Sequence, residues 1–205
     1  TAKQKGEYLY KAIGERHDWS RMELLQNVQK SLESVRFDAT LEQMVNIPSG
    51  TCKVELKNLR GISKMTMRVY RVNAKASDLQ SVYVDSDKGY KKIKPMLSAR
   101  PEMVKEHAYT GKAPYELFED ELTIDALPVG VYLVEFESSP RTKEVERVLY
   151  YVSNQRAIAQ QYPDKKMDYV VVDATTGHPV KGAQLTFTRN NATLTLTAND
   201  KGECE

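Results

Sequence analysis

The 205 residues are enough for one or two domains with at least one hydrophobic core. The 30 Lys and Arg residues nearly balance the 28 Asp and Glu residues, so a net charge of +2 leaves no electrostatic footprint for nucleic acid. No apolar run approaches the roughly 20 residues that a membrane-spanning helix needs.

The first residues, Thr1 to Lys5, contain neither an initiator Met nor the apolar run of a signal peptide. We therefore expect the chain to begin inside a longer gene product or after processing, with any export signal upstream. The two cysteines, Cys52 and Cys204, form neither a disulfide framework nor a zinc-binding spacing. These two cysteines do not indicate the cellular compartment of the protein, and the sequence does not determine whether they are reduced or oxidised.

Residues 1–35 have helical periodicity. Between Met22 and Leu32, apolar residues recur at helical spacing, and Ser20 with Glu23 fits a capping box at the start of this helix. The stretch from Glu7 to Arg16 predicts a weaker helix that Gly14 breaks. One and a half amphipathic helices cannot bury themselves, so we expect them to pack on the residues after position 35 or on upstream chain.

From Val35 the apolar period changes to two, which is typical of strands with one wet face. Alternation predicts strands over 35–41, over 52–57 after the turn at 48–50, and over 65–72. Residues 73–120 are polar and weakly patterned, and they predict irregular edge structure. Alternation returns over 122–126, 131–136 and 145–152.

These strands are joined by Gly and Pro turns, with no helical crossovers between them, which favours an antiparallel sandwich over a parallel sheet. Residues 36–152 therefore form the first predicted sandwich. Residues 153–167 predict a connector. Strands over 168–173, 184–188 and 193–197 then predict a second, truncated sandwich within 153–205, with exposed edges and half a core.

Asp168–Leu185 (DYVVVDATTGHPVKGAQL) is followed by Thr195–Gly202 (TLTANDKG). Together they resemble the opening of a macroglobulin domain of the alpha-2-macroglobulin family in bacteria of the Bacteroides type. Leu127–Leu133 (LPVGVYL) resembles the step before the last hairpin of the preceding domain, and Asn58–Val72 resembles its early strands. The order of these pieces agrees with the family across residues 36–205.

The resemblance implies immunoglobulin-like or fibronectin-III-like sandwiches in a protease-trapping protein of the periplasm or cell envelope, anchored as a lipoprotein by upstream sequence. The family's thioester motif is absent, and Gly202-Glu203-Cys204-Glu205 has the wrong order and no Gln. The turn at 177–183 also occurs in accessory domains of TonB-dependent receptors and in fibronectin-like modules. Its Pro179, Gly177 and Gly182 serve the turn itself.

The residues that most often carry catalysis or metal binding show no productive spacing. His17, His107 and His178 lie in three separate segments, and neither a Gly-x-Ser-x-Gly elbow nor a His-Glu-x-x-His helix is present. Asp85 to Gly89 begins like a calcium loop, but Gly89, Tyr90 and Met96 occupy positions five, six and twelve, so we expect a polar turn. The acids at 119–121 are expected in a solvated loop.

Other notable residues have structural explanations. The basic runs at 91–94 and 165–166 are typical of solvated strand edges. Tyrosines in strands usually pack in cores and cross-strand pairs, and a carbohydrate-binding face is the alternative. The tyrosines in the predicted strands are Tyr132, Tyr150, Tyr151 and Tyr169. Asn191-Ala192-Thr193 is a glycosylation sequon, relevant only in a eukaryotic secretory pathway.

The sequence therefore predicts a mainly β protein with a helical lead-in, without catalytic, cofactor-binding or metal-binding residues and without a cofactor. The expected role is architectural, within an alpha-2-macroglobulin-like envelope protein whose partners are its own further domains and target proteases. The alternative is a carbohydrate- or protein-binding module of a TonB-receptor or polysaccharide-utilisation system. A hydrolase is the third hypothesis, and self-association through the truncated second sandwich remains open.

Overall fold

The computed structural model describes residues 2–15, 22–79, 81–142, 145–189 and 192–204. Internal contacts divide the chain into two units. Unit 1 comprises Thr1–Met44, Thr51–Ala126 and Gly130–Tyr151, and unit 2 comprises Val45–Gly50, Leu127–Val129 and Val152–Glu205.

Unit 1 begins with two helices, α1 (Ala2–Glu15) and α2 (Met22–Glu33). The helix predicted over 22–32 is confirmed, and its expected cap Ser20 lies outside the described residues. The other helix runs from Ala2 and passes through Gly14 instead of breaking there, because a glycine inside a helix costs only about 1 kcal/mol. Tyr10 of α1 donates a hydrogen bond to Glu33 of α2 over 2.8 Å.

The helices also contact the β-structure of unit 1. The rings of Tyr10 and Tyr115 lie 5.0 Å apart. Arg60, which is 7% exposed, donates hydrogen bonds to the carbonyl oxygens of Ser31 and Ser34 at the end of α2. A guanidinium group satisfies these carbonyls well, since the last turn of a helix leaves them without intrahelical partners.

Three antiparallel strands in the order β1-β3-β6 form sheet A of unit 1. The strands are β1 (Arg36–Leu41), β3 (Cys52–Arg60) and β6 (Phe118–Ile124). Alternation along β3 buries Cys52, Val54 and Leu56 completely while their neighbours face solvent, as the period-two pattern predicts. The register shifts next to Asn58, whose φ is 54°.

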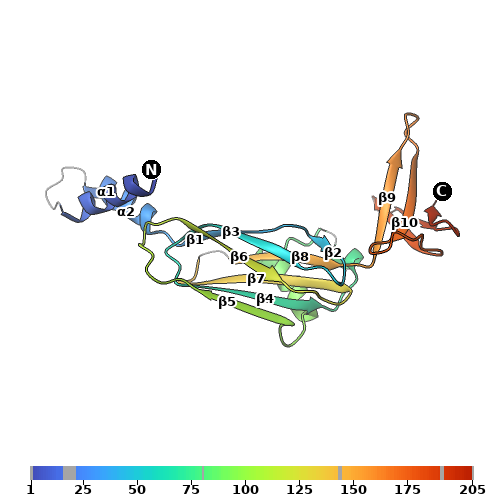
Figure 1. Cartoon of the computed structure of the whole chain (residues 1–205), viewed down its shortest axis with the longest axis horizontal. Helices are drawn as coiled ribbons and strands as arrows, with labels where there is room; N and C mark the ends of the chain where they lie inside the picture. The colour runs from blue at the N-terminus through green and yellow to red at the C-terminus, as the bar shows by residue number, and fades with distance from the viewer. Residues whose placement is uncertain (1, 16–21, 80, 143–144, 190–191, 205) are drawn as a thin grey trace. The chain divides into compact units, whose positions relative to one another are not determined.

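Sheet B contains four strands of unit 1 in the order β8-β7-β4-β5 (Figure 1). They are β4 (Lys64–Val72), β5 (Met103–Ala108), β7 (Gly130–Ser139) and β8 (Glu146–Val152). Met67 lies opposite Phe136, and Val69 lies opposite Val134, all four buried. The predicted fold class, a mainly β antiparallel sandwich, is confirmed.

The expectation of irregular edge structure over 73–120 is wrong. This segment contains η1 (Ala76–Leu79), α3 (Asp87–Ile93), η2 (Lys94–Met96), β5 and the start of β6. Ile93 of α3 and Leu79 of η1 pack against Val72 and Leu133, which lie on one face of sheet B. The helix was not predicted because it has only seven residues, too few for a periodic pattern.

Unit 2 contains the two-residue β2 (Val45–Asn46) and two small sheets, β13-β10-β9 and β11-β12. The strands of these sheets are β9 (Gln155–Gln161), β10 (Met167–Asp173), β11 (Gln184–Arg189), β12 (Ala192–Thr197) and β13 (Glu203–Cys204). The connector predicted over 153–167 is wrong, because β9 pairs with β10 along its whole length. Every residue of β9 is exposed, so it lacks the apolar alternation that marks a strand.

The core of unit 2 is small. In one hydrophobic cluster of its described residues, Val171, Ala198 and Cys204 are buried, and partly buried residues such as Tyr169 and Leu196 pack against them. Phe187 and Leu194, which lie opposite each other on β11 and β12, are 36% and 58% exposed. The inner faces of this unit are therefore only partly covered by its own described residues.

Candidate functional site

A polar cluster joins the edges of the two sheets of unit 1. His107 on β5 places Nδ1 2.6 Å from Oδ2 of Asp120 on β6. The Tyr109 hydroxyl donates a hydrogen bond to the same oxygen over 2.7 Å. Since a carboxylate oxygen only accepts, the His107 Nδ1–H must donate. Strand pairing places both residues, because β5 is an edge of sheet B and β6 is an edge of sheet A.

The environment of Asp120 favours its charged form. Burial on its own would raise the pKa of Asp120, but the hydrogen bonds from Tyr109 and His107 outweigh it and hold that pKa below its usual value. Burial, followed by the hydrogen bond to Asp120, raises the pKa of Tyr109 far above its usual range. The cluster is therefore a carboxylate that accepts hydrogen bonds from two donors, the Tyr109 hydroxyl and the His107 ring N–H.

A His–Asp pair can orient a general base, but this pair lacks the rest of that machinery in the described chain. No described hydrogen bond joins His107 to a Ser, Thr or Cys side chain. Both donors converge on one oxygen of Asp120, and the His107 side chain is 43% exposed. The geometry is that of a clasp between two sheet edges.

The prediction of a solvated loop for the acids at 119–121 is wrong, because these residues lie on β6. Their side chains alternate, so Glu119 and Glu121 are exposed while Asp120 is partly buried against His107. Sequence reasoning missed the His107–Asp120 pair because 12 residues of weakly patterned sequence separate the two, and strand β5 itself was not predicted.

The other residues weighed from the sequence lie apart. His178 is exposed in the turn after β10, and His17 and Asn191 lie outside the described residues. Asp85 and Asp87 flank Ser86, whose hydroxyl caps α3 by accepting a hydrogen bond from the backbone N–H of Gly89. The predicted polar turn is thus a helix start, with Lys91, Lys92 and Lys94 on the helix and its continuation instead of a strand edge. Lys165 and Lys166 lie in the turn between β9 and β10.

Buried positions account for the cysteines and for two of the tyrosines. Cys52 and Cys204 are free and buried, and burial raises the pKa of the Cys52 thiol. Tyr132 and Tyr150 are at most 1% exposed, so they cannot form part of a carbohydrate-binding face. In the part of the chain that the structure describes, no group of three or more His, Cys, Asp or Glu side chains is placed to hold a metal ion. No helix among these residues is long and apolar enough to cross a membrane.

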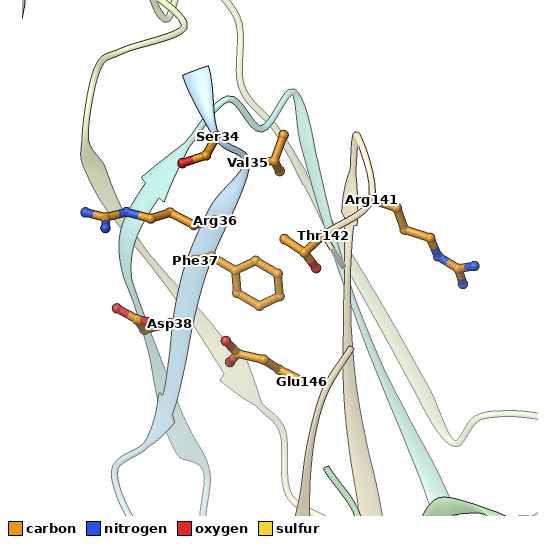
Figure 2. Close-up of a pocket in the computed structure, with 8 residues that line it drawn as sticks. All are labelled: Ser34, Val35, Arg36, Phe37, Asp38, Arg141, Thr142 and Glu146. Carbon is orange, nitrogen blue, oxygen red and sulfur yellow. The ribbon is translucent and has the colours of Figure 1, made fainter. Parts of the chain in front are cut away.

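A groove of about 570 Å³ lies along the free edge of β1. One wall consists of residues 34–38, and the other consists of Arg141, Thr142 and Glu146 (Figure 2). Figure 2 shows the ring of Phe37 directed into the groove, whereas Arg36 and Asp38 point to the opposite side of the strand. Alternation along β1 produces this arrangement.

Charged groups surround the groove, and most are already engaged. Glu146 accepts a hydrogen bond from the backbone N–H of Ala39 over 2.9 Å. Asp38 accepts one from Asn58 over 2.6 Å, and Arg141 forms an ion pair with Glu137 at 2.7 Å. Sequence reasoning missed the groove, because Thr142 and Glu146 reach β1 only through the sheet arrangement.

Comparison with known proteins leaves the family open. No family model matches the sequence, and no curated protein matches it. Trypsin-activated alpha-2-macroglobulin from Escherichia coli superposes with a TM-score of 0.44 and 14% identity, over 83% of this chain and 13% of that chain. The sporulation control protein Spo0M from Bacillus subtilis superposes with a TM-score of 0.32 and 9% identity, over 80% of this chain and 78% of that chain. At these TM-scores neither similarity assigns a family.

Proposed function

We propose that this chain is a non-catalytic, architectural part of an alpha-2-macroglobulin-like envelope protein that inhibits proteases by entrapment. The observation that carries the proposal is the tandem order of two antiparallel β units with macroglobulin-like motifs in sequence. The polar cluster supports a non-catalytic role, since its carboxylate accepts hydrogen bonds from two donors that tie two sheets together.

The turn that carries the resemblance has a defined structural role in unit 2. Asp173 accepts hydrogen bonds from the backbone N–H groups of Thr175 and Thr176, and these lower its pKa. Gly177 and Gly182 have φ of 74° and 73°, a region that favours glycine. Pro179 forms a β-bridge with Val172. The motif thus fixes how β10 leads into β11, which suits a repeated building block.

An activity assay on the full-length gene product tests the proposal. The protein is incubated with trypsin, and hydrolysis of a large protein substrate is compared with hydrolysis of a small chromogenic peptide. Entrapment should suppress only the first, because an enclosed protease still admits small substrates. Undiminished cleavage of both substrates, or equal suppression of both, contradicts entrapment.

The runner-up is a carbohydrate- or protein-binding accessory module of a TonB-receptor or polysaccharide-utilisation system. The groove beside β1 favours this function, because binding sites of sandwich domains are commonly formed by edges and loops. Sequencing the gene on both sides of these residues separates the two. Further sandwiches support the scaffold, whereas an adjoining TonB-type barrel or glycosidase domain supports the accessory module.

The partners and location belong to the same proposal. We infer that the chain works outside the cytoplasm, in the periplasm or cell envelope, with further domains of its own polypeptide and with target proteases. Self-association through unit 2 is a further expectation, supported by the exposure of Leu194 and Phe187 on its inner face. Light scattering at high concentration checks it, and a clean monomer argues against it.

A further inference from the structure

Strand β9 forms one edge of the sheet β13-β10-β9 in unit 2, beside β10 (Figure 1). All seven of its residues are exposed, and it pairs with β10 residue by residue without a register shift. Natural proteins commonly protect such an edge against further pairing with a Lys, a Pro or a bulge. Strand β9 has none of these, and its single charged residue is Arg156.

The hydrogen bonds to β10 show which backbone groups of β9 point away from it. The N–H of Tyr162 donates to the carbonyl oxygen of Lys166. At the other end, the carbonyl oxygen of Asn154 accepts from the N–H of Ala174. The even-numbered residues of β9 therefore bond β10, and by the alternation of an antiparallel ladder the odd-numbered residues direct their N–H and C=O groups to the outer edge.

Most of this outer edge is available for pairing. At its start, the hydroxyl group of Ser153 binds both the N–H and the C=O of Gln155. Further along, in the part of the chain that the structure describes, no hydrogen bond engages the backbone N–H groups of Ala157, Ala159 or Gln161. These three residues leave an unpaired ladder in the middle and at the end of the strand.

The sequence of β9 matches itself when the strand is turned around Ile158. Two copies paired antiparallel about this residue place Ala157 opposite Ala159 and Gln155 opposite Gln161. These are the odd-numbered residues, so the groups that point outward on one copy meet those of the other. A two-fold symmetric contact requires such self-complementarity, because every contact in it occurs twice.

The side chains on the other face of β9 suit the same pairing. Arg156 lies opposite Gln160 of the second copy, so no like charges meet. Ile158 is 53% exposed and lies beside the partly buried Val170 of β10. It meets Ile158 of the second copy in a non-hydrogen-bonded pair, where side chains lie closest. Pairing thus covers an apolar side chain that is otherwise exposed to solvent.

We propose that the chain forms a two-fold symmetric dimer in which the β9 edges of two copies pair as antiparallel strands centred on Ile158. The pairing joins the two copies of the sheet β13-β10-β9 into one continuous sheet. The proposal rests on the expectation that unit 2 self-associates, and it assigns that association to the edge of β9 instead of the inner face. It does not depend on protease entrapment.

Two substitutions of Gln160 test the pairing by sedimentation equilibrium of the whole chain over a concentration series. Gln160→Glu should tighten the dimer about tenfold, because the new carboxylate faces Arg156 of the second copy at two symmetric places. Gln160→Arg should weaken the dimer by about the same factor, because like charges then meet.

The same two variants supply their own control for folding. Within one chain, Gln160 lies opposite Asp168 of β10. Urea unfolding of the dilute monomer should therefore show the opposite order, with Gln160→Arg the more stable and Gln160→Glu the less stable. An effect on the dimer that only followed the stability of the hairpin would have the wrong sign.

A cysteine at the centre of β9 tests the register. Ile158→Cys should form an intermolecular disulfide under mild oxidation, because the two copies of position 158 lie directly opposite each other. Arg156→Cys is the matched control, since its two copies lie four residues apart, about 13 Å along the strands, which is too far for a disulfide. The native cysteines, Cys52 and Cys204, are both buried.

A chain that stays monomeric at every concentration overturns the proposal, and so does a dimer whose affinity ignores both Gln160 substitutions. If Leu194→Lys abolishes such a dimer, the inner face holds the two copies together; the expectation of self-association then stands while the assignment to β9 fails. Equal crosslinking through Ile158→Cys and Arg156→Cys would also contradict the proposal, because the two strands would meet without the stated register.

Discussion

At the residue scale, unit 1 places a small number of charged side chains at points where two elements meet. Asp120 holds His107 and Tyr109 at the edges of the two sheets. Arg147 stacks 3.6 Å above the Tyr90 ring of α3 and donates a hydrogen bond to Glu135 on β7 over 2.7 Å. Interactions of charged side chains contribute little to stability when they are exposed. They contribute more when they are partly desolvated, since solvent then screens the charges less.

Asp120→Asn should destabilise the chain at neutral pH by about 1 to 2 kcal/mol, because charge-assisted hydrogen bonds are lost. The pKa of Asp120 is lowered in the folded state, so its contribution is present above the unfolded value of about 3.9 and disappears as pH falls through the folded pKa. Urea unfolding from pH 7 to pH 3 should therefore show the two stability curves converging at low pH. Glu121→Gln, an exposed neighbour, is the control, and a constant gap down to pH 3 would contradict the role of Asp120.

Arg147→Ala should reduce the free energy of unfolding by about 3 kcal/mol, because it leaves the Glu135 carboxylate partly buried without its cation. The two side chains are 10% and 16% exposed. Arg147→Lys keeps the charge but loses the planar stacking on Tyr90, so it should cost about 1 kcal/mol. Urea unfolding of both variants measures this order. Equal losses for Lys and Ala would show that stacking, and not charge, is what matters.

At the element scale, short segments are placed by contacts with the sheets more than by their own propensity. Helix α3 has seven residues, too few to be stable alone, yet Ile93 anchors it on sheet B and Ser86 caps its start. Its Gly89 is buried against the backbone, and a Cβ added there would lie 1.8 Å from the carbonyl oxygen of Tyr83. By contrast, a Cβ added at Gly14 of α1 would meet no atom within 4 Å.

Gly89→Ala should therefore destabilise unit 1 by about 2 kcal/mol or more, because the backbone of α3 has to shift. Gly14→Ala should instead increase stability by as much as about 1 kcal/mol, since alanine is the better helix former. Thermal unfolding followed by circular dichroism measures both. A neutral Gly89→Ala would mean that α3 is not packed against the segment around Tyr83.

At the scale of the whole molecule, the two units differ in how much apolar surface they bury. Unit 1 has two facing sheets with fully buried Tyr132, Phe136 and Leu56, and a further cluster under α3. Among the described residues of unit 2, the hydrophobic cluster on the sheets buries Val171, Ala198 and Cys204. Because stability grows with apolar area removed from water, we expect unit 2 to unfold first.

Gly202→Ala should lower the stability of unit 2 selectively. Gly202 has φ of 76°, and an added Cβ would lie 2.4 Å from the carbonyl oxygen of Val171. Gly177→Ala is the matched control, because its φ of 74° is as unfavourable but no atom lies within 4 Å, so it should cost only about 1 to 2 kcal/mol. Hydrogen exchange during a urea titration should show an earlier transition in β9 to β13, shifted further by Gly202→Ala. If Gly202→Ala shifted the unfolding transition of β4 and β7 by the same amount as that of β9 to β13, selective destabilisation would be contradicted.

The sequence by itself determined the fold class and most strands. In a half-buried strand every second residue is apolar and faces the core, as Cys52, Val54 and Leu56 do. Only the tertiary structure decided β5, β9 and α3, which are too short, too polar or too exposed to carry such a pattern. It alone also paired His107 with Asp120 and brought Glu146 to β1, since their contacts depend on which strand edges meet. Local periodicity records whether a residue is buried, but not which distant residue it meets.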